Sequence, residues 1–163
     1  MLSLQLCWRN PGVLHMRKIS QNVSTARSIT KETFHGLSIG AGLTLTQVSE
    51  QREIVTGYPA LAVAAHLVST PQLRNMGTLG GNLCVDTRCN YYNQTYWWRE
   101  AIGFCLKRDG DTCWVAPGSS RCWAVSSSDT APVLIALNAQ VHLVGPMGER
   151  TVPVYDLYRD DGM

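Results

Sequence analysis

Four cysteines in one segment of the chain have the residue type and the spacing that a metal centre requires. The intervals between them are 16, 8 and 9 residues, and the four are Cys89, Cys105, Cys113 and Cys122. Thiolate sulfur is soft and polarizable, and it loses its proton when it binds a metal. Four thiolates in one loop can therefore hold an iron–sulfur cluster or zinc. Cys84 lies just upstream of this segment, and Cys7 lies far from it.

The spacing by itself leaves three interpretations open. It lacks the C-x-x-C pairs of zinc ribbons and matches neither common ferredoxin spacing, so a loop that folds around its metal is expected. An iron–sulfur cluster is the first interpretation and structural zinc is the second. A disulfide-stapled secreted loop is the third, because the N-terminal residues are interrupted too soon, by Arg9, Asn10 and Pro11, to serve as a signal peptide.

Aromatic and charged side chains surround these cysteines in the sequence. The aromatic ones are Tyr91, Tyr92, Tyr96, Trp97, Trp98, Trp114 and Trp123. The simplest interpretation is a small satellite core, and a compatible one is a shell that keeps water away from a cluster. The charged ones are Arg88, Arg99, Lys107, Arg108 and Arg121 against Glu100, Asp109 and Asp111. A net positive shell would offset an anionic cluster, and a solvated mixed-charge surface explains these residues equally well.

A glycine-rich turn is the second candidate site. Its residues are Gly77, Thr78, Gly80, Gly81 and Asn82. Backbone N–H groups in such a turn can converge on an anion without obstruction by side chains. Thr78 and Asn82 could add side-chain hydrogen bonds to phosphate or ribityl oxygens. A plain loop with bulges is an equally good interpretation.

The elements before this turn can be predicted from local patterns. Residues 12–16 could form a short strand, and residues 35–42 alternate into a strand that ends at glycines. Thr44 or Thr46 could cap a helix that runs through residue 50. Residues 59–68 are rich in alanine and predict a helix.

The elements after the cysteine segment are predicted in the same way. Residues 131–137 form an apolar helix with Pro132 in its first turn. Residues 139–144 alternate as a strand, and residues 150–157 return as a second strand after a hairpin turn.

The composition limits the class of protein. At 163 residues the chain can bury a core as one domain, and 45% hydrophobic with 16% charged residues is ordinary for a globular protein. The net charge of +2 is too small to favour nucleic acid or a membrane surface, and no apolar run approaches a membrane span. Six cysteines without an export signal favour metal or redox use and a cytoplasmic location.

Two motifs and the segment between them resemble a known family. M-G-T-L-G-G-N-L at 76–83 and S-D-T-A-P at 128–132 resemble the FAD-binding subunit of molybdenum hydroxylases, whose fold is shared with the flavin domain of xanthine dehydrogenase. The intervening segment, with N-L-C-V-D-T-R-C, Y-N-Q-T, W-W-R and D-T-C, resembles the beta subunit of 4-hydroxybenzoyl-CoA reductase. In that subunit an inserted loop holds a 4Fe–4S cluster beside the flavin. The resemblance covers roughly residues 36–163, and residues 1–35 match poorly.

The resemblance implies a role for each matching position. Cys89, Cys105, Cys113 and Cys122 become the cluster ligands, and Cys84 becomes a non-ligand at the end of the glycine turn. By the same resemblance, the residues that contact the pyrophosphate and ribityl groups of FAD would be Thr78, Leu79, Gly80, Gly81 and Asn82. Asp129 becomes a further contact, because its carboxylate can accept hydrogen bonds from hydroxyl groups of the flavin nucleotide.

The resemblance also implies the fold. We expect an α+β fold, the second subdomain of a molybdopterin-dehydrogenase-type (PCMH-type) FAD-binding domain. Its antiparallel sheet would pack with helices, and the iron–sulfur loop would be inserted at residues 84–123 of a domain spanning 36–163. The family's earlier loop, of the A-G-G-T-D-L type, and its C-terminal domain have no counterpart in this sequence. We therefore expect a shortened or incomplete chain that binds FAD weakly by itself.

The function implied is electron transfer within an oxidoreductase complex, most closely that of 4-hydroxybenzoyl-CoA reductase. The cofactors would be FAD and a 4Fe–4S cluster. The expected partners are a molybdopterin-binding large subunit, a 2Fe–2S small subunit and an external carrier such as ferredoxin. No catalytic residue is expected, since no catalytic triad, H-E-x-x-H or Walker motif is found. The alternatives are a zinc-stabilised interaction module and a non-functional fragment.

Overall fold

The computed structural model describes residues 3–6, 29–32, 36–145, 148–158 and 162. It divides into two compact units. The first, here called the sheet unit, comprises Met1–Cys84 and Ser128–Tyr158, and the second, the cysteine unit, comprises Val85–Ser127 and Arg159–Met163. The predicted flavin residues belong to the sheet unit, and the predicted metal ligands belong to the cysteine unit. The strand expected at residues 12–16 lies outside the described residues.

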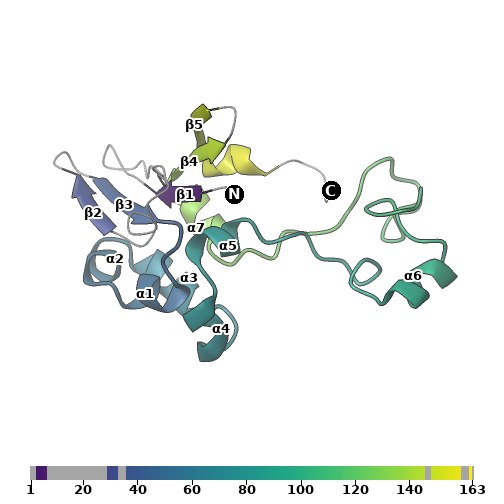
Figure 1. Cartoon of the computed structure of the whole chain (residues 1–163), viewed down its shortest axis with the longest axis horizontal. Coiled ribbons are helices and arrows are strands. Elements are labelled where there is room, and N and C mark those ends of the chain that lie inside the picture. Colours follow the sequence, from purple (N-terminus) through teal and green to yellow (C-terminus); the bar gives the residue numbers. More distant parts are fainter. Residues whose placement is uncertain (1–2, 7–28, 33–35, 146–147, 159–161, 163) are drawn as a thin grey trace. The chain divides into compact units, whose positions relative to one another are not determined.

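The described strands form one five-stranded sheet with the order β2-β3-β1-β4-β5 (Figure 1). Every pair is antiparallel, as the sequence predicted. The strands are β1 (Ser3–Leu6), β2 (Ile29–Glu32), β3 (Gly36–Gly40), β4 (Gln140–Gly145) and β5 (Gly148–Pro153). The hairpin between β4 and β5 closes with Gly145 opposite Gly148, as expected. The returning strand is shorter than predicted, because a 3-10 turn, η2 (Val154–Leu157), replaces its last residues.

Three helices follow β3. Thr44 caps α1 (Leu45–Glu50) with a full capping box, since its hydroxyl accepts from Gln47 N–H and the Gln47 side chain accepts from Thr44 N–H. Helix α2 (Arg52–Gly57) continues directly into α3 (Pro59–Leu67), which begins with Pro59 at its first position. Both α1 and α3 confirm the sequence predictions.

Four more short helices, of five or six residues each, follow in the described part of the chain. Thr70 caps α4 (Pro71–Met76), and Thr78 caps α5 (Leu79–Leu83). Helix α6 (Tyr96–Ala101) lies in the cysteine unit, and α7 (Ala131–Ala136) leads into β4, as predicted. None of the described helices is long and apolar enough to cross a membrane.

The core of the sheet unit joins the strands to the helices. Side chains from β3, β4, α1–α3, α5, α7 and η2 form one hydrophobic cluster. Its largest fully buried side chains are Ile39, Val48, Ile54, Leu61, Leu79, Leu83, Leu134, Val141 and Val154. Because Leu79 and Leu83 belong to this cluster, the glycine-rich segment is anchored in the core of the unit.

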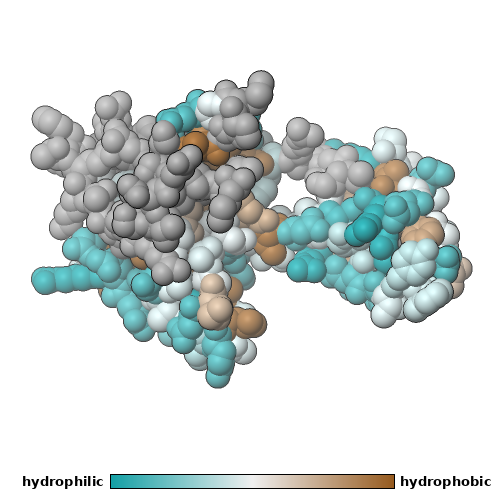
Figure 2. All heavy atoms as spheres, in the orientation of Figure 1, coloured by the Kyte–Doolittle hydropathy of each residue, from teal (hydrophilic) through white to brown (hydrophobic). Residues whose placement is uncertain are grey.

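The cysteine unit has a different construction. Apart from α6, its described residues form turns and extended segments. Its two ends are joined by a pair of backbone hydrogen bonds, Arg88 N–H to Val125 O at 2.8 Å and Val125 N–H to Arg88 O at 3.0 Å. On the face drawn in Figure 2 its colours run mostly from hydrophilic to neutral, with few hydrophobic residues. Apart from three cysteines, Ala124 is the one buried hydrophobic residue among the described residues of this unit, so ordinary apolar packing contributes little to holding it together.

Candidate functional site

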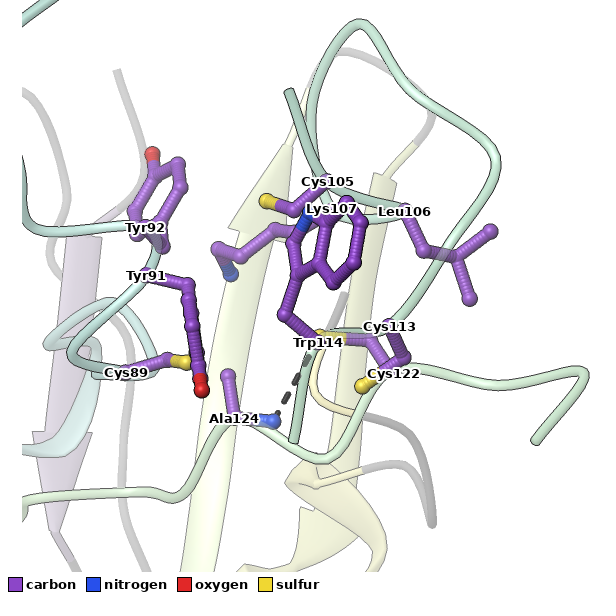
Figure 3. Close-up of a pocket in the computed structure, with 10 residues that line it drawn as sticks. All are labelled: Cys89, Tyr91, Tyr92, Cys105, Leu106, Lys107, Cys113, Trp114, Cys122 and Ala124. Carbon is purple, nitrogen blue, oxygen red and sulfur yellow. Dashed lines mark hydrogen bonds between the residues drawn. The ribbon is translucent and has the colours of Figure 1, made fainter. Parts of the chain in front are cut away.

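The four cysteines that the sequence singled out line one pocket of the cysteine unit (Figure 3). They project from four separate segments of the ribbon. In the sequence, intervals of 8 to 16 residues separate them. The residues that line the pocket are Cys89, Tyr91, Tyr92, Cys105, Leu106, Lys107, Cys113, Trp114, Cys122 and Ala124. The fold thus brings the four cysteines to the lining of one pocket.

Tight turns position three of these cysteines. The carbonyl of Cys89 accepts from Asn93 N–H at 2.9 Å, and the carbonyl of Cys113 accepts from Ala116 N–H at 3.0 Å. The carbonyl of Cys105 accepts from two N–H groups, those of residues 108 and 110, at 2.8 and 3.2 Å. Each of the three cysteines therefore opens a turn whose backbone is hydrogen-bonded to it. Cys122 differs, because its Sγ itself accepts from Ala124 N–H at 3.4 Å.

Gly110 is a structural requirement that the sequence analysis missed. A Cβ placed on Gly110 would lie 2.8 Å from Cys105 N, 2.8 Å from Gly103 O and 2.9 Å from the Phe104 carbonyl carbon. All three atoms belong to the backbone, so none can move aside easily. Gly110 is needed here because the chain crosses directly over the backbone of a predicted ligand.

The buried side chains of the cysteine unit are mainly thiols. Among its described residues, those that are buried are Arg99, Cys105, Cys113, Cys122, Ala124 and Gly162. The predicted aromatic satellite core is wrong, because Trp97 is 77% exposed and Trp98, Trp114 and Trp123 are 36–48% exposed. Tyr92 and Trp114 instead line the pocket beside the cysteines. A unit of this size without an apolar core usually depends on a metal or on disulfides.

Lys107 lies in the wall of the pocket with its ammonium group held by three acceptors. Its side chain is 7% exposed. Nζ donates to Asp86 Oδ1 at 2.9 Å, to Gly162 O at 2.8 Å and to the hydroxyl of Thr87. The hydrogen bond from Lys107 lowers the pKa of the Asp86 carboxyl. Nζ also lies 4.9 Å from the centre of the Tyr92 ring.

Arg99 is a second buried cation in the same unit. Its Nη2 donates to Arg108 O at 3.0 Å and lies 3.8 Å from Asp109 Oδ2. Its guanidinium carbon lies 5.5 Å from the ring centres of both Tyr92 and Phe104. Its Nε is buried and makes no hydrogen bond with any described residue. Tyr92, which lines the pocket, is therefore close to both buried cations.

The thiols do not converge on a single point. Within the described ranges, no three His, Cys, Asp or Glu side chains gather closely enough to hold one metal ion. No disulfide joins the five described cysteines to one another. The observed arrangement is thus four separate thiols around one pocket.

The glycine-rich segment of the sheet unit forms a short helix, α5, and not an open turn. Thr78 caps it, since its hydroxyl accepts from Gly81 N–H at 3.0 Å. The other N–H groups are also bonded within the chain: Leu79 to Leu43 O, Gly80 to Ala41 O and Asn82 to Thr78 O, each at 2.9 Å. Contrary to expectation, the N–H groups of residues 79–82 therefore do not converge on an anion, because each donates to an oxygen of this chain. The N–H of Thr78 forms no hydrogen bond with any described residue.

The two central glycines of α5 have different surroundings. Gly80 is buried, and a Cβ on it would lie 2.8 Å from Ala41 Cβ and 3.1 Å from Ala41 O. Gly81 is exposed, and a Cβ on it would meet one atom within 4 Å, the hydroxyl oxygen of Thr78 at 3.0 Å. Gly80 is therefore required for packing of α5 against the end of β3, whereas Gly81 presents bare backbone at the surface.

Asn82 joins the two predicted flavin motifs. Its Oδ1 accepts from Ser128 Oγ at 3.1 Å and from Thr130 N–H and Oγ1 at 3.1 and 2.7 Å. Its Nδ2 lies 3.5 Å from Asp129 Oδ2. Thr130 is fully buried, while Asp129 is exposed. Sequence reasoning identified Asn82 and Asp129 but missed Ser128 and Thr130 as its partners.

Cys84 belongs to the sheet unit and is not among the residues that line the cysteine pocket. It ends α5, and its N–H donates to Gly80 O at 3.0 Å. It lies at the surface, where partial desolvation raises the pKa of its thiol. The preceding residue, Leu83, accepts a hydrogen bond at 2.8 Å from the hydroxyl of Tyr158, whose pKa is raised by burial.

Comparison with known proteins identifies the family. Residues 17–163 match the family described as FAD binding domain in molybdopterin dehydrogenase. The aldehyde oxidoreductase FAD-binding subunit PaoB of Escherichia coli strain K12 is 32% identical over 139 residues, which are 78% of this chain and 42% of that protein.

Two other relatives match over shorter stretches. The xanthine dehydrogenase FAD-binding subunit of Escherichia coli O157:H7 is 37% identical over 81 residues, which are 50% of this chain and 27% of that protein. The nicotinate dehydrogenase FAD-subunit of Eubacterium barkeri is 38% identical over 80 residues, or 49% of this chain and 26% of that protein. The chain spans less than half the length of each of these relatives. Because the family match covers most of its residues, this chain belongs to the FAD-binding domain family of the molybdopterin dehydrogenases.

Proposed function

We propose that this chain is the FAD-binding and 4Fe–4S-binding electron-transfer part of a molybdenum-dependent oxidoreductase. One observation carries the proposal: in a member of an FAD-binding family, four cysteines spread over a long insertion line a single pocket. The flavin would be held by the sheet unit and the cluster by the cysteine unit.

The proposed flavin contacts are those that the family resemblance names: Thr78, Leu79, Gly80, Gly81, Asn82 and Asp129. The structure favours three of them as direct contacts. Thr78 offers an N–H that no described residue uses, and Gly81 offers exposed backbone without a side chain. Asp129 offers an exposed carboxylate, which accepts hydrogen bonds from hydroxyl groups. Asn82 would act differently, since its Oδ1 already accepts three hydrogen bonds and holds the Asp129 segment beside α5.

The proposed cluster ligands are Cys89, Cys105, Cys113 and Cys122. A 4Fe–4S cluster takes one thiolate on each iron, so its ligands surround it as four corners and do not converge on one ion. Four separate thiols around one pocket fit that requirement. The buried cations Lys107 and Arg99 fit it too, because four thiolates give the centre a negative charge. The scarcity of other buried side chains supports a unit that is ordered by its metal.

The cofactors would supply the chemistry: a 4Fe–4S cluster passes one electron at a time, and FAD takes one or two. The residues of this chain would bind and orient them and limit their exposure to water. The relatives are named as FAD-binding subunits, which supports assembly with further subunits. We propose a molybdopterin-binding large subunit, a 2Fe–2S small subunit and an external carrier such as ferredoxin as partners.

The substrate of the complex is proposed from the insertion. Its motifs resemble those of 4-hydroxybenzoyl-CoA reductase, so the proposed reaction is reductive dehydroxylation of an aromatic acyl-CoA. The named relatives act in aldehyde, xanthine and nicotinate oxidoreductases, which are therefore the competing substrate classes. Assay of the assembled complex with an aromatic acyl-CoA, an aldehyde, xanthine and nicotinate distinguishes these classes. Turnover of any substrate by the chain alone contradicts the electron-transfer role.

Anaerobic reconstitution with iron and sulfide tests the cluster. We expect about four irons and four sulfides per chain, with brown colour and a visible absorption band that dithionite bleaches. A colourless chain that takes up one zinc and no iron contradicts the cluster and favours the zinc-stabilised interaction module instead. FAD binding is measured separately, by titration of the quenching of flavin fluorescence.

A further inference from the structure

A buried ammonium group stands beside the four thiols of the cysteine pocket. Lys107 lines the pocket together with Cys89, Cys105, Cys113 and Cys122, and its side chain is 7% exposed. Lysine carries its charge on a flexible chain and is rarely buried without a reason. The three predicted ligands closest to full burial, Cys105, Cys113 and Cys122, are 4–7% exposed. The cation and the thiols thus share one poorly solvated region.

The ammonium group is fixed in place by contacts from distant parts of the unit. It donates to Asp86 Oδ1, to the hydroxyl of Thr87 and to Gly162 O. It also lies 4.9 Å from the centre of the Tyr92 ring, whose side chain lines the same pocket. Lysine has three N–H donors, and all three find acceptors here. The charge is therefore held at the pocket and does not swing out to solvent.

The countercharge of this lysine faces water. Asp86 is 56% exposed, whereas Lys107 is 7% exposed. Water and salt screen an exposed charge far more than a buried one. Arg99 and Asp109 repeat the arrangement, with side-chain exposures of 8% and 55%. The interior of the unit consequently carries a positive potential that its own carboxylates only partly offset.

We propose that Lys107 raises the reduction potential of the cluster that the four cysteines hold. This inference rests on the cluster of the proposed function. Adding one electron to a 4Fe–4S centre increases its negative charge, so a fixed cation nearby stabilises the reduced form more than the oxidised form. The potential of such clusters depends on net charge and on solvent exposure, and Lys107 acts on the first of these.

The test compares charge variants of the full chain after anaerobic reconstitution. Lys107→Met removes the charge and keeps the length of the side chain, while Lys107→Arg keeps the charge. Arg108→Met is the matched control, because Arg108 is the next residue but its side chain is 64% exposed. Asp86→Asn removes the countercharge and leaves the ammonium group with its other two acceptors. Iron content is measured first, and each loaded variant is then titrated with dithionite while the signal of the reduced cluster is followed by electron paramagnetic resonance.

We expect Lys107→Met to shift the midpoint potential to more negative values and Asp86→Asn to shift it to more positive values. Lys107→Arg and Arg108→Met should stay near the unaltered chain. A fully loaded Lys107→Met with an unchanged potential overturns the inference, and so does an Arg108→Met shift as large as that of Lys107→Met. If Lys107→Met fails to load iron, Asp86→Asn decides, and an unchanged or lowered potential overturns the inference. An unaltered chain that takes up no iron refutes the proposed function itself, before any potential is measured.

Discussion

The side chain of Asn82 accepts two hydrogen bonds from Thr130, one from its backbone N–H at 3.1 Å and one from its hydroxyl at 2.7 Å. The two residues are 48 positions apart, and residues 85–127 of the cysteine unit lie between them in the sequence. Thr130 is fully buried, so these contacts are shielded from competing water. These contacts therefore hold together the two segments of the sheet unit on either side of residues 85–127.

Replacement of Asn82 by Ala should destabilise the sheet unit. It leaves the buried N–H and hydroxyl of Thr130 without their acceptor, and such a loss costs about 1–3 kcal/mol. Urea unfolding, followed by circular dichroism, measures the change. Asn75→Ala is the control, because Asn75 also accepts a side-chain hydrogen bond, from Thr46, but at an exposed position. Equal effects of the two variants would show that the link to Thr130 adds nothing to stability.

The two glycines of α5 should respond differently to alanine. Gly80→Ala places a methyl group 2.8 Å from Ala41 Cβ, and such overpacking costs about 1–3 kcal/mol. Gly81→Ala meets the Thr78 hydroxyl alone and gains helix propensity, so its stability should stay near that of the unaltered chain. Its FAD affinity should fall, because the methyl group covers the exposed backbone. Thermal unfolding and flavin titration together separate the effects, and unchanged FAD affinity in Gly81→Ala would refute its role in the flavin site.

Replacement of any one of the four pocket cysteines by Ala should abolish stable binding of four irons. Each variant removes one corner of the cluster, and the long insertion then loses the metal that offsets its ordering entropy. Iron analysis and visible absorption after anaerobic reconstitution measure the result. Cys84→Ala is the matched control, since Cys84 is outside the pocket and should load iron normally. Loss of iron in Cys84→Ala with full loading in Cys89→Ala would show that the ligand assignment is wrong.

Gly110→Ala should lower iron loading, although Gly110 is not one of the proposed cluster ligands. Its Cβ would lie within 2.8–2.9 Å of three backbone atoms around Cys105, so the turn that presents this cysteine must shift. Gly118→Ala is a control in the same insertion, because a Cβ there meets nothing within 4 Å. Iron content per chain is again the measurement. Normal loading of Gly110→Ala would mean that the turn at Cys105 tolerates the shift.

Stability at alkaline pH should depend on Tyr58. Burial raises its pKa from 10.0 to about 12, which disfavours the ionised form in the folded chain. As pH rises above 10 the unfolded chain loses this proton first, so the free energy of unfolding should fall between about pH 10 and 12. Tyr58→Phe should remove that part of the decline, as measured by urea unfolding at several pH values. Tyr155→Phe is the exposed control, and an equal effect there would contradict the assignment to Tyr58.

Sequence patterns predicted the elements whose causes are local. Thr44 was expected to cap a helix, and its capping box with Gln47 involves residues three positions apart. The helix at residues 59–68 and the hairpin after residue 139 were predicted from composition, periodicity and turn residues, and α3, β4 and β5 confirm them. The four cysteines could be selected because thiolate sulfur is a ligand suited to soft metal centres, which residue type and spacing alone indicate.

Other expectations were wrong because they depended on contacts between distant residues. The tryptophans of the cysteine unit were expected to form a small core, yet each is at least 36% exposed, and three cysteines are among the few buried side chains there. The glycine turn was expected to offer its N–H groups to an anion. Carbonyls of residues 41 and 43 accept two of them instead, because the end of β3 passes beside α5.

By itself the sequence determined which residues have the chemistry for a metal centre and a flavin site, because residue type and spacing are written along the chain. The tertiary structure alone decided how these residues are used. It placed Gly80 against Ala41, it brought the side-chain oxygen of Asn82 into hydrogen-bonding contact with Thr130, and it buried Lys107 in the pocket that the cysteines line. The first two contacts join residues tens of positions apart, and Lys107 is held by hydrogen bonds to Asp86 and Gly162, which are 21 and 55 positions away. Burial and hydrogen bonding between such distant residues depend on how the chain folds back on itself, which no local pattern records.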